Sequence, residues 1–326
     1  MSLAAAGALA LAAALDDAVA EPPTRAHPVA WLGRVVAGLD DRLPDTRAAG
    51  VGLAASLPLA FAVLLAGPVL ALGAVRLPLP LVGSAPVPSA VGAGVVLFVC
   101  SSRRMLLDVA GDVLALVGDD LPAARNELRA LAGRDASELS ADHVRSAVVE
   151  SAAENLADGL VAPLLAFAAG ATAGAAAGAS VAAGLALAAG AAAWVKGVNT
   201  LDSMLGYRDK RVGTPAARLD DAVMWLPARL SAVALAVAFA APRSLVRTRA
   251  WVDGVPSPNS GWPMGVAAAG LDARLEKPGV YVLNPGAVLP DVAAARRGVR
   301  AVALAGVLSY ALAGLALAPL EVSPWL

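Results

Sequence analysis

The sequence of 326 residues contains one cysteine, two histidines and no common metal or nucleotide motif. The lone thiol, Cys100, cannot form an intramolecular disulfide, and its apolar neighbours predict a buried side chain. No CxxC or HExxH pattern occurs, which argues against a metal site built from cysteine and histidine. No GxxxxGK[ST] occurs, nor a GxGxxG between a strand and a helix, so neither common nucleotide fold is predicted.

Charge is also scarce. Charged residues make up 16% of the chain, whereas soluble domains carry roughly 25%. Hydrophobic residues reach 58% and the mean hydropathy is +0.69, so we expect an integral membrane protein. The net charge of -1 gives no overall field for nucleic acid or an anionic surface. Because no basic, aromatic-rich pattern occurs either, nucleic-acid binding is not expected.

Apolar runs of about 20 residues predict membrane-spanning helices. Such runs, some of them shorter, cover residues 3–20, 51–74, 87–102, 159–195 (long enough for two helices) and 299–318. The first run ends in Ala-Val-Ala, which resembles a secretory cleavage site, but no basic residues precede it, so a retained helix is favoured. Within 159–195, Gly170, Gly174 and Gly178 recur every fourth residue, a pattern that lets helices approach closely. A flexible linker is the alternative, and the leucines on either side argue against it.

Arginines in the short loops predict the orientation. They place 21–50, 103–157, 196–221 and 243–298 in the cytoplasm and both termini outside. A full crossing at 222–242 would put 243–298 outside, so we expect 222–242 to be re-entrant or buried. The predicted fold class is all-α: a polytopic integral membrane protein of the cell membrane with about six transmembrane helices plus amphipathic or re-entrant cytoplasmic helices. We expect a single membrane-embedded domain over 1–326, with 103–157 as a cytoplasmic or interfacial helical segment and 243–298 as a cytoplasmic loop segment.

Three acidic residues, Glu150, Glu154 and Asp158, are spaced four residues apart. On a helix they would share one drifting face, where like charges repel and need compensation. Mg²⁺, which takes hard oxygen ligands and often a bridged phosphate, would compensate them. Asn155 lies beside them. A solvent-exposed helix face is the alternative.

A second polar group follows the Ala/Gly-rich run and contains Lys196, Asn199, Asp202 and Ser203. Ionisable groups at the end of an apolar run are costly and mark functional sites. The asparagine and aspartate can share a ligand, and the lysine can hold a phosphate as a point charge. Alternatively, Asn199 or Thr200 begins a new helix as its N-cap.

Other polar residues stand at the edges of apolar segments. Asp220 and Asp221 precede the apolar segment 222–242. N-capping of a helix there would explain one of the two carboxylates and leave the other for a metal or an amine. Arg229 lies inside this apolar segment and needs a partner, such as a carboxylate or a phosphate. The turn-rich run 257–263 either separates two helices or contributes ligand groups. His27, before a proline, is more typical of a structural role.

Together these segments resemble the CobD/CbiB family of membrane-bound adenosylcobinamide-phosphate synthases. The resemblance extends over nearly the whole chain and rests on several long matches in the family's order: LDDAVAEPPTRAHPVAWLGR from Leu15, GRDASEL from Gly133, VVESAAENLADGLVAPL from Val148, NTLDSMLGYRDKR from Asn199, ARLDDAVMWLPARLSA from Ala217 and SPNSGWP from Ser257. Four residues depart from the family pattern. Ala20 stands where glycine is usual, Glu21 where aspartate is usual, Val255 where histidine is frequent, and Met264 where glutamate is frequent.

The resemblance implies amide-bond formation between a propionate carboxyl of adenosylcobyric acid and an amino-alcohol phosphate, usually (R)-1-amino-2-propanol O-phosphate. It implies ATP and Mg²⁺ as the driving reagents and the lipid bilayer as the environment, with an active face in the cytoplasm, and it leaves open a complex with other membrane enzymes of cobamide assembly. Because no nucleotide motif is present, either ATP binds in an unfamiliar pocket or activation occurs elsewhere.

The chemistry suggests three roles for the polar residues. A carboxyl group must be activated before an amine attacks it, which calls for Mg²⁺, cations around phosphate and a base. The catalytic candidates are Glu150, Glu154, Asp202 and Asp221. The metal candidates are Glu154, Asp158 and Asp220. The substrate-binding candidates are His27, Arg134, Asn155, Lys196, Asn199, Ser203, Tyr207, Lys210, Arg211, Arg229, Ser257 and Asn259.

Two other functions compete with the synthase. A related AmpE-like membrane sensor would lack synthase activity, but it has less need for so many acids and amides. A corrinoid transporter would carry charges within its spans and often inverted repeats. Here the charges gather in segments expected to be cytoplasmic, and no clear repeat is seen.

Overall fold

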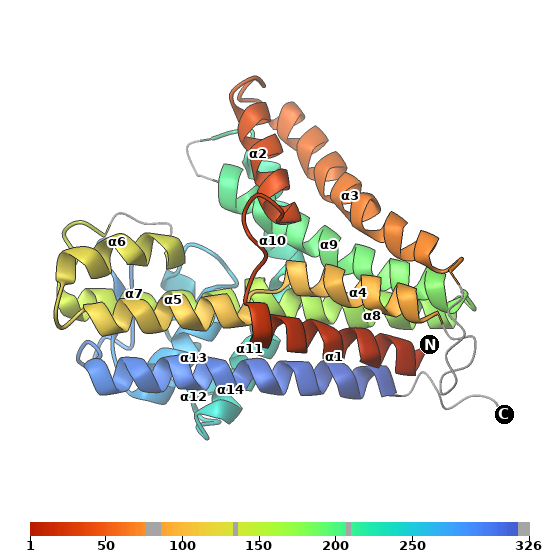
Figure 1. Ribbon diagram of the computed structural model, residues 1–326. Helices are drawn as coiled ribbons and strands as arrows, with labels where there is room; N and C mark the ends of the chain where they lie inside the picture. Colours follow the sequence, from red (N-terminus) through yellow and green to blue (C-terminus); the bar gives the residue numbers. More distant parts are fainter. Residues whose placement is uncertain (76–85, 133–135, 207–209, 319–326) are drawn as a thin grey trace. The chain divides into compact units, whose positions relative to one another are not determined.

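Helices make up nearly all of the protein. The computed structural model describes residues 1–75, 86–132, 136–206 and 210–318, and its described strands form one short hairpin (Figure 1). Five helical stretches are long and apolar enough to cross a membrane: Arg47–Leu72, Val87–Leu116, Ala141–Ala176, Val181–Leu205 and Val292–Leu317. The all-α, multi-pass membrane fold predicted from the sequence is therefore confirmed.

Two of these stretches extend beyond the expected spans. Val87–Leu116 and Ala141–Ala176 both include residues that the sequence placed in the segment 103–157. In addition, a bent pair of helices, Thr214–Val223 with Trp225–Ala238, would be a sixth span or a re-entrant loop. The re-entrant placement of 222–242 and the orientation of the chain stay predictions.

The chain divides into two compact units, which are described separately. Unit 1 comprises Met1–Ser102, Ala162–Val223 and Tyr310–Leu326, and unit 2 comprises Arg103–Val161 and Met224–Ser309. The single domain predicted over 1–326 stays a prediction. The helices of unit 1 are α1 (Ser2–Val19), α2 (Pro28–Asp40), α3 (Arg47–Leu72), α4 (Val87–Cys100), α8 (Ala162–Ala176), α9 (Val181–Leu205) and α10 (Thr214–Val223). Cys100, at the end of α4, is buried as expected.

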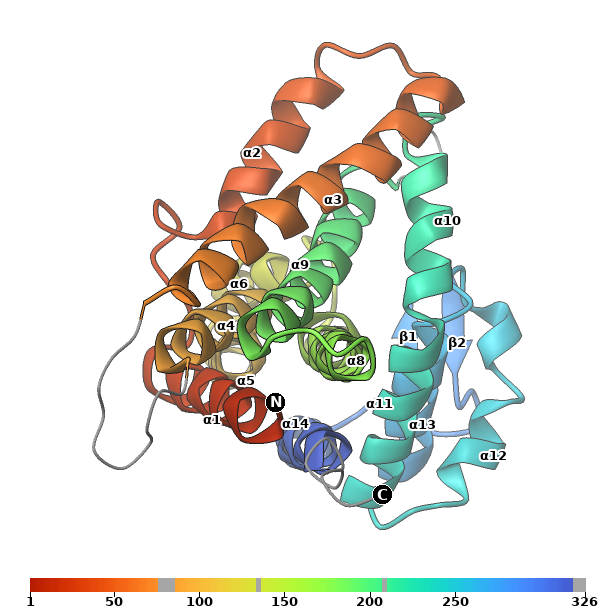
Figure 2. The same cartoon turned by 90° about the vertical axis from the view of Figure 1, so that its right-hand side faces the viewer.

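Helices α8 and α9 form a hairpin because small residues let their backbones meet. A Cβ atom added at Gly174 would lie 2.7 Å from the Cα of Gly184, and one at Gly170 would lie 2.8 Å from the Cα of Ala188. Gly178 turns the chain with a φ of 66°, and Ser180 then caps α9 by accepting a hydrogen bond from the amide of Ala183. The glycine pattern thus predicted the hairpin correctly, and the linker alternative is wrong. Besides α8, helix α3 also packs against α9, and Figure 2 shows the two running alongside each other.

Helix α9 continues unbroken through the polar residues near its end. The hydroxyl of Thr200 donates to the carbonyl of Lys196, and that of Ser203 donates to the carbonyl of Asn199, each at 2.8 Å. These side chains therefore bond back to the preceding turn instead of starting a helix. The alternative, in which Asn199 or Thr200 caps a new helix, is wrong.

Asp220 and Asp221 likewise lie inside a helix. Both belong to α10, and the next helix, α11 (Trp225–Ala238), begins after Met224 without a side-chain cap. The prediction that one of the two aspartates is an N-cap is therefore wrong, because α10 begins at Thr214, eight residues before the expected apolar segment 222–242.

Unit 2 surrounds its β hairpin with helices. They are α5 (Arg103–Leu116), α6 (Leu121–Leu131), α7 (Ala141–Leu156), a π-helical turn (Ala157–Val161), α11, α12 (Ser244–Thr248), a 3₁₀ turn (Val252–Gly254), α13 (Gly261–Leu271) and most of α14 (Val292–Leu317). Strands β1 (Leu275–Lys277) and β2 (Tyr281–Leu283) pair antiparallel with Glu276 opposite Val282. Leu275 and Leu283 are fully buried, which fixes the face that the hairpin turns inward.

A strained turn follows α1. Ala20 has φ 62° and ψ -70°, and the amide of Glu21 donates to the carbonyl of Val19 at 2.9 Å. This is a γ-turn with a positive central φ, which is rare and strained for a residue with a Cβ atom. The strain explains why glycine suits this position better than alanine.

We expect Ala20→Gly to raise the stability of the protein by about 1 kcal/mol, because glycine adopts a positive φ without steric cost. The measurement is the thermal unfolding midpoint in detergent. The control is Ala18→Gly, at an exposed position inside α1, which should cost about 0.5–1 kcal/mol. Equal destabilisation by both substitutions would contradict a strained turn at Ala20.

Candidate functional site

In unit 1, the loop between α1 and α2 brings a carboxylate and an imidazole together. His27 caps α2, and its Nδ1 accepts a hydrogen bond from the amide of Val29 at 3.2 Å. Its Nε2 faces a carboxylate oxygen of Glu21 at 4.0 Å. The His27 side chain is 9% exposed and the Glu21 side chain 32%, so one is buried and the other is reachable from solvent. His27 thus has the structural role that its sequence position suggests.

Lys196 of α9 adds a cation to this pair. It is half-buried and lies within electrostatic range of both Glu21 and His27. Among the residues that the structure describes, Lys196 has no ion pair or side-chain hydrogen bond. Burial raises the pKa of Glu21, as does the neighbouring Asp16, while the Lys196 ammonium opposes them. Burial and Lys196 both lower the pKa of His27. We call Glu21, His27 and Lys196 the mixed-charge group.

Further polar candidates follow Lys196 along α9. Asn199 is buried, Asp202 is half-buried and Ser203 is exposed. Asp202 also lies within electrostatic range of Asp221, on α10. The structure therefore brings two predicted catalytic carboxylates together.

The segment after α9 is tied to the end of α2 and the loop that follows it. Lys210 forms an ion pair with Asp40 at 2.5 Å, and the amide of Val212 donates to Asp45 at 2.7 Å. Arg211 is exposed. The candidates Tyr207 and Arg134 lie outside the described residues. The phosphate-binding role of Lys210 stays a prediction, and Asp40 competes with a phosphate for its ammonium.

In unit 2, the carboxyl group of Glu150 is an anchor for the β hairpin. It is fully buried and accepts hydrogen bonds from the Ser146 hydroxyl at 2.6 Å, the Tyr281 hydroxyl at 2.6 Å and the Glu276 amide at 3.2 Å. Donors from α7, β1 and β2 thus converge on one side chain. The solvent-exposed face considered for this part of the chain is wrong for Glu150. Its catalytic role stays a prediction, and its contacts are those of a positioning residue.

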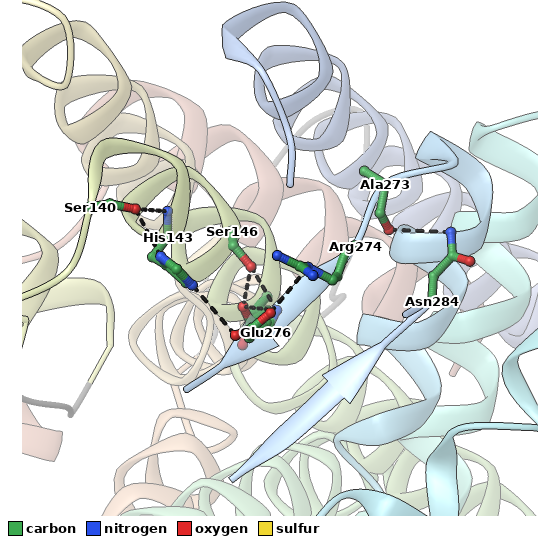
Figure 3. Close-up of polar contacts among 8 residues, drawn as sticks. Ser140, His143, Ser146, Ala273, Arg274, Glu276 and Asn284 are labelled. Carbon is green, nitrogen blue, oxygen red and sulfur yellow. Dashed lines mark hydrogen bonds and ion pairs between the residues drawn. The ribbon is translucent and has the colours of Figure 1, made fainter. Parts of the chain in front are cut away.

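The Glu276 side chain collects a second set of contacts around the same strand. One carboxylate oxygen lies 3.5 Å from Nε2 of His143, and the other lies 3.1 Å from Nε of Arg274. Nδ1 of His143 meets the Ser140 hydroxyl at 2.8 Å. Figure 3 shows His143 of α7 and Arg274, which directly precedes β1, pointing toward Glu276. Sequence reasoning missed this set, because no motif spacing links the start of α7 to a strand that follows about 130 residues later.

Glu154 and Asn155 of α7 are half-buried, and so is Asp158 in the π-helical turn that follows α7. The amide of Asn155 donates to the carbonyl of Ser151 at 2.9 Å. Asp158 lies in the π-helical turn, which interrupts the four-residue periodicity that would align it with Glu154. Asp220, the third metal candidate, belongs to unit 1. Within the described ranges, no three His, Cys, Asp or Glu side chains form a group suited to a metal ion.

Arg229 holds the loop 257–260 in unit 2. It donates to the side-chain oxygen of Asn259 at 2.5 Å and to the carbonyl of Pro258 at 3.2 Å. Its guanidinium lies 4.8 Å from the ring centre of Trp225 and 5.3 Å from that of Trp262. The partners of Arg229 in the structure are therefore a side-chain amide, a backbone carbonyl and two aromatic rings. Ser257 orders the same loop by accepting from the amide of Asn259 at 3.2 Å.

We expect Arg229→Lys to loosen this loop, because an ammonium cannot stack on both rings and bond two oxygens at once. The expected result is a rise of about tenfold in amide hydrogen exchange over 257–260, equivalent to about 1.4 kcal/mol. The control is Arg243→Lys, at an exposed position. Unchanged hydrogen exchange in the Arg229→Lys variant would show that the loop 257–260 stays ordered without the Arg229 contacts.

Comparison with known proteins identifies the family. The family model described as CobD/CbiB protein matches residues 9–311. The chain belongs to the CobD/CbiB family. It is 32% identical over 289 residues to the probable cobalamin biosynthesis protein CobD of Methanothermobacter thermautotrophicus, covering 85% of this chain and 86% of the relative. It is 33% identical over 266 residues to cobalamin biosynthesis protein CobD of Rhodobacter capsulatus, covering 78% and 75%. No solved structure matches.

The family match includes residues from both units, so neither unit alone represents the family. The chain is thus a cobalamin biosynthesis protein with several membrane-spanning helices. At two positions where it departs from the family pattern, Val255 and Met264, the side chains are buried. The sulfur of Met264 accepts a hydrogen bond from the Tyr281 hydroxyl at 3.5 Å, so this methionine packs against the anchor of the β hairpin.

Proposed function

We propose that the protein is an adenosylcobinamide-phosphate synthase. It joins a propionate carboxyl of adenosylcobyric acid to the amine of an amino-alcohol phosphate, most simply (R)-1-amino-2-propanol O-phosphate, and forms an amide bond. The observation that carries the proposal is the polar end of α9, where Lys196, Asn199, Asp202 and the nearby Asp221 gather in a chain that matches the family from residue 9 to 311. Lys196 is half-buried and lies within electrostatic range of the Glu21 carboxylate, and a cation and a carboxylate in one unit suit a phosphate-bearing amine.

The residues present can serve each requirement of amide formation. Lys196 provides a cation for a phosphate. Asp202 and Asp221, within electrostatic range of each other, provide a base for the proton that the amine loses as it attacks. Asn199 orients a substrate group by hydrogen bonds. We place the reacting face in the cytoplasm, where both substrates are soluble.

Mg²⁺ and ATP belong to the proposal as the means of activating the carboxyl group. Mg²⁺ prefers oxygen ligands and is often held by one or two carboxylates plus substrate phosphates. Glu154 and Asp158 of unit 2 provide carboxylate oxygens of this kind, and the role of base stays with Asp202 and Asp221. When bound, the ion would screen the charge of the transferring phosphoryl group.

We expect Asp202→Asn to lower kcat about 100-fold or more, the range typical of a lost general base, and Glu154→Gln to lower it as well. The measurement is formation of adenosylcobinamide phosphate by the purified full-length protein in detergent. Asp112→Asn, at an exposed position on α5, should leave the rate unchanged. Full activity in both site variants would rule out these assignments.

A further inference from the structure

The γ-turn at Ala20 determines where Glu21 lies. The turn reverses the chain directly after α1, and the Glu21 carboxylate then faces Nε2 of His27. Strained backbone persists where the surrounding structure holds it, and such positions gather at functional sites. Glu21 is also partly exposed, unlike the fully buried Asp16 one turn before it. A ligand can therefore reach Glu21.

The hydrogen bonding of His27 sets the proton arrangement around Glu21. Because Nδ1 accepts from the amide of Val29, the neutral ring carries its proton on Nε2, the nitrogen that faces Glu21. The lowered pKa of His27 keeps this ring neutral near pH 7. Two full charges of opposite sign then remain in the mixed-charge group, the Glu21 carboxylate and the Lys196 ammonium. In the described part of the chain they form no direct ion pair.

We infer that the mixed-charge group is the binding site for the amino-alcohol phosphate, with Glu21 holding the ammonium end and Lys196 the phosphate end. The inference rests on the proposed function for the identity of the ligand. A small zwitterion needs a carboxylate and a cation that are near each other but not already paired. The structure provides this arrangement from the α1–α2 loop and α9 of unit 1.

The site also suits the first proton transfer. As the amine is made ready to attack, an N–H bond of the ammonium breaks, its electron pair stays on nitrogen, and the proton forms an O–H bond with the Glu21 carboxylate. The raised pKa of Glu21 brings the carboxylate closer to neutral pH, where a general base works best. The buried Asp16 carboxylate favours the same uptake.

The test is calorimetric binding of two probes to the full-length protein in detergent. Ethanolamine O-phosphate carries both an ammonium and a phosphate, whereas glycerol 3-phosphate carries the phosphate alone. We expect Glu21→Gln to weaken ethanolamine phosphate about tenfold or more, the effect of one lost charge-assisted hydrogen bond, and to leave glycerol phosphate unchanged. Glu21→Asp should have an intermediate effect, and Lys196→Met should weaken both probes. Asp17→Asn, exposed on α1, is the matched control.

The pH dependence adds a second readout. As the pH falls through the raised pKa of Glu21, the carboxylate is protonated, and the affinity for ethanolamine phosphate should fall relative to glycerol phosphate. His27 and Asp16 lie beside Glu21, and the phosphates of the two probes titrate differently because only one probe carries an ammonium, so Glu21→Gln provides the baseline. The ratio should fall more steeply with falling pH in the wild type than in Glu21→Gln.

Equal weakening of both probes by Glu21→Gln, or weakening of neither, would overturn the inference. Binding is measured without turnover, so it is decided separately from the proposed function. If the wild type forms no product yet binds ethanolamine phosphate through Glu21, the synthase assignment fails and the amine site stands. If product forms normally in Glu21→Gln with an unchanged KM for the amine, the amine site fails and the synthase assignment stands.

Discussion

Replacing Glu150 with methionine is expected to lower the free energy of unfolding by about 2–4 kcal/mol, because buried donors that lose their acceptor cost about 1–3 kcal/mol each. Methionine has a similar length but accepts hydrogen bonds only weakly. The hydroxyls of Ser146 and Tyr281 now donate to Glu150 and would lose that bond, while the Glu276 amide keeps its bond to Ser146 at 2.8 Å. The measurement is thermal or denaturant unfolding of the purified protein in detergent.

Two further variants make this result specific. Tyr281→Phe removes one donor and should cost about 1 kcal/mol, and the effects of the two substitutions should not add, since both residues belong to one hydrogen bond. Glu127→Met on α6 (Leu121–Leu131), at a half-buried position, should change stability by less than about 0.5 kcal/mol. A stable Glu150→Met protein would show that Glu150 is retained for chemistry and not for its place in the hairpin.

Gly174→Ala is expected to destabilise the α8–α9 hairpin by about 1–3 kcal/mol, the usual cost of forcing an extra methyl into a packed contact. The new Cβ would lie 2.7 Å from the Cα of Gly184, and a backbone atom cannot turn aside as a flexible side chain can. The two helices would have to separate along their contact. The unfolding midpoint in detergent reports the change.

The control is another glycine inside a candidate span. Gly52 of α3 has no atom within 4 Å of an added Cβ apart from its own helix and chain neighbours, so Gly52→Ala should be neutral or slightly stabilising through its better helix propensity. Similar destabilisation by both substitutions would mean that glycine flexibility matters here and that close packing of α8 on α9 does not.

The helical fold could be predicted from the sequence because apolar length and glycine spacing are local signals. The spacing of Gly170 and Gly174 predicted the close contact between α8 and α9. Cys100 is buried, as its apolar neighbours indicated. The ends of helices were harder. Thr200 resembled the N-cap of a new helix, but its hydroxyl bonds to the preceding turn, and residue type alone does not determine which of the two occurs.

The candidate site was predictable only in part. Charged residues at the end of an apolar run pointed to Lys196 and Asp202, and their proximity to Glu21 and Asp221 depends on tertiary packing that no spacing encodes. Glu21 attracted attention only as a departure from the family pattern. Two of the donors to Glu150 come from strands more than 120 residues away, so its role as an anchor was hidden from the sequence.

One assay tests directly whether the protein forms the amide bond. Purified full-length protein in detergent is given adenosylcobyric acid, (R)-1-amino-2-propanol O-phosphate, ATP and Mg²⁺, and products are identified by mass spectrometry, with Asp202→Asn in parallel. We expect adenosylcobinamide phosphate from the wild type and about 100-fold less from the variant. No product from the wild type, together with cobinamide uptake by proteoliposomes that contain it, would contradict the proposed synthase and indicate a transporter.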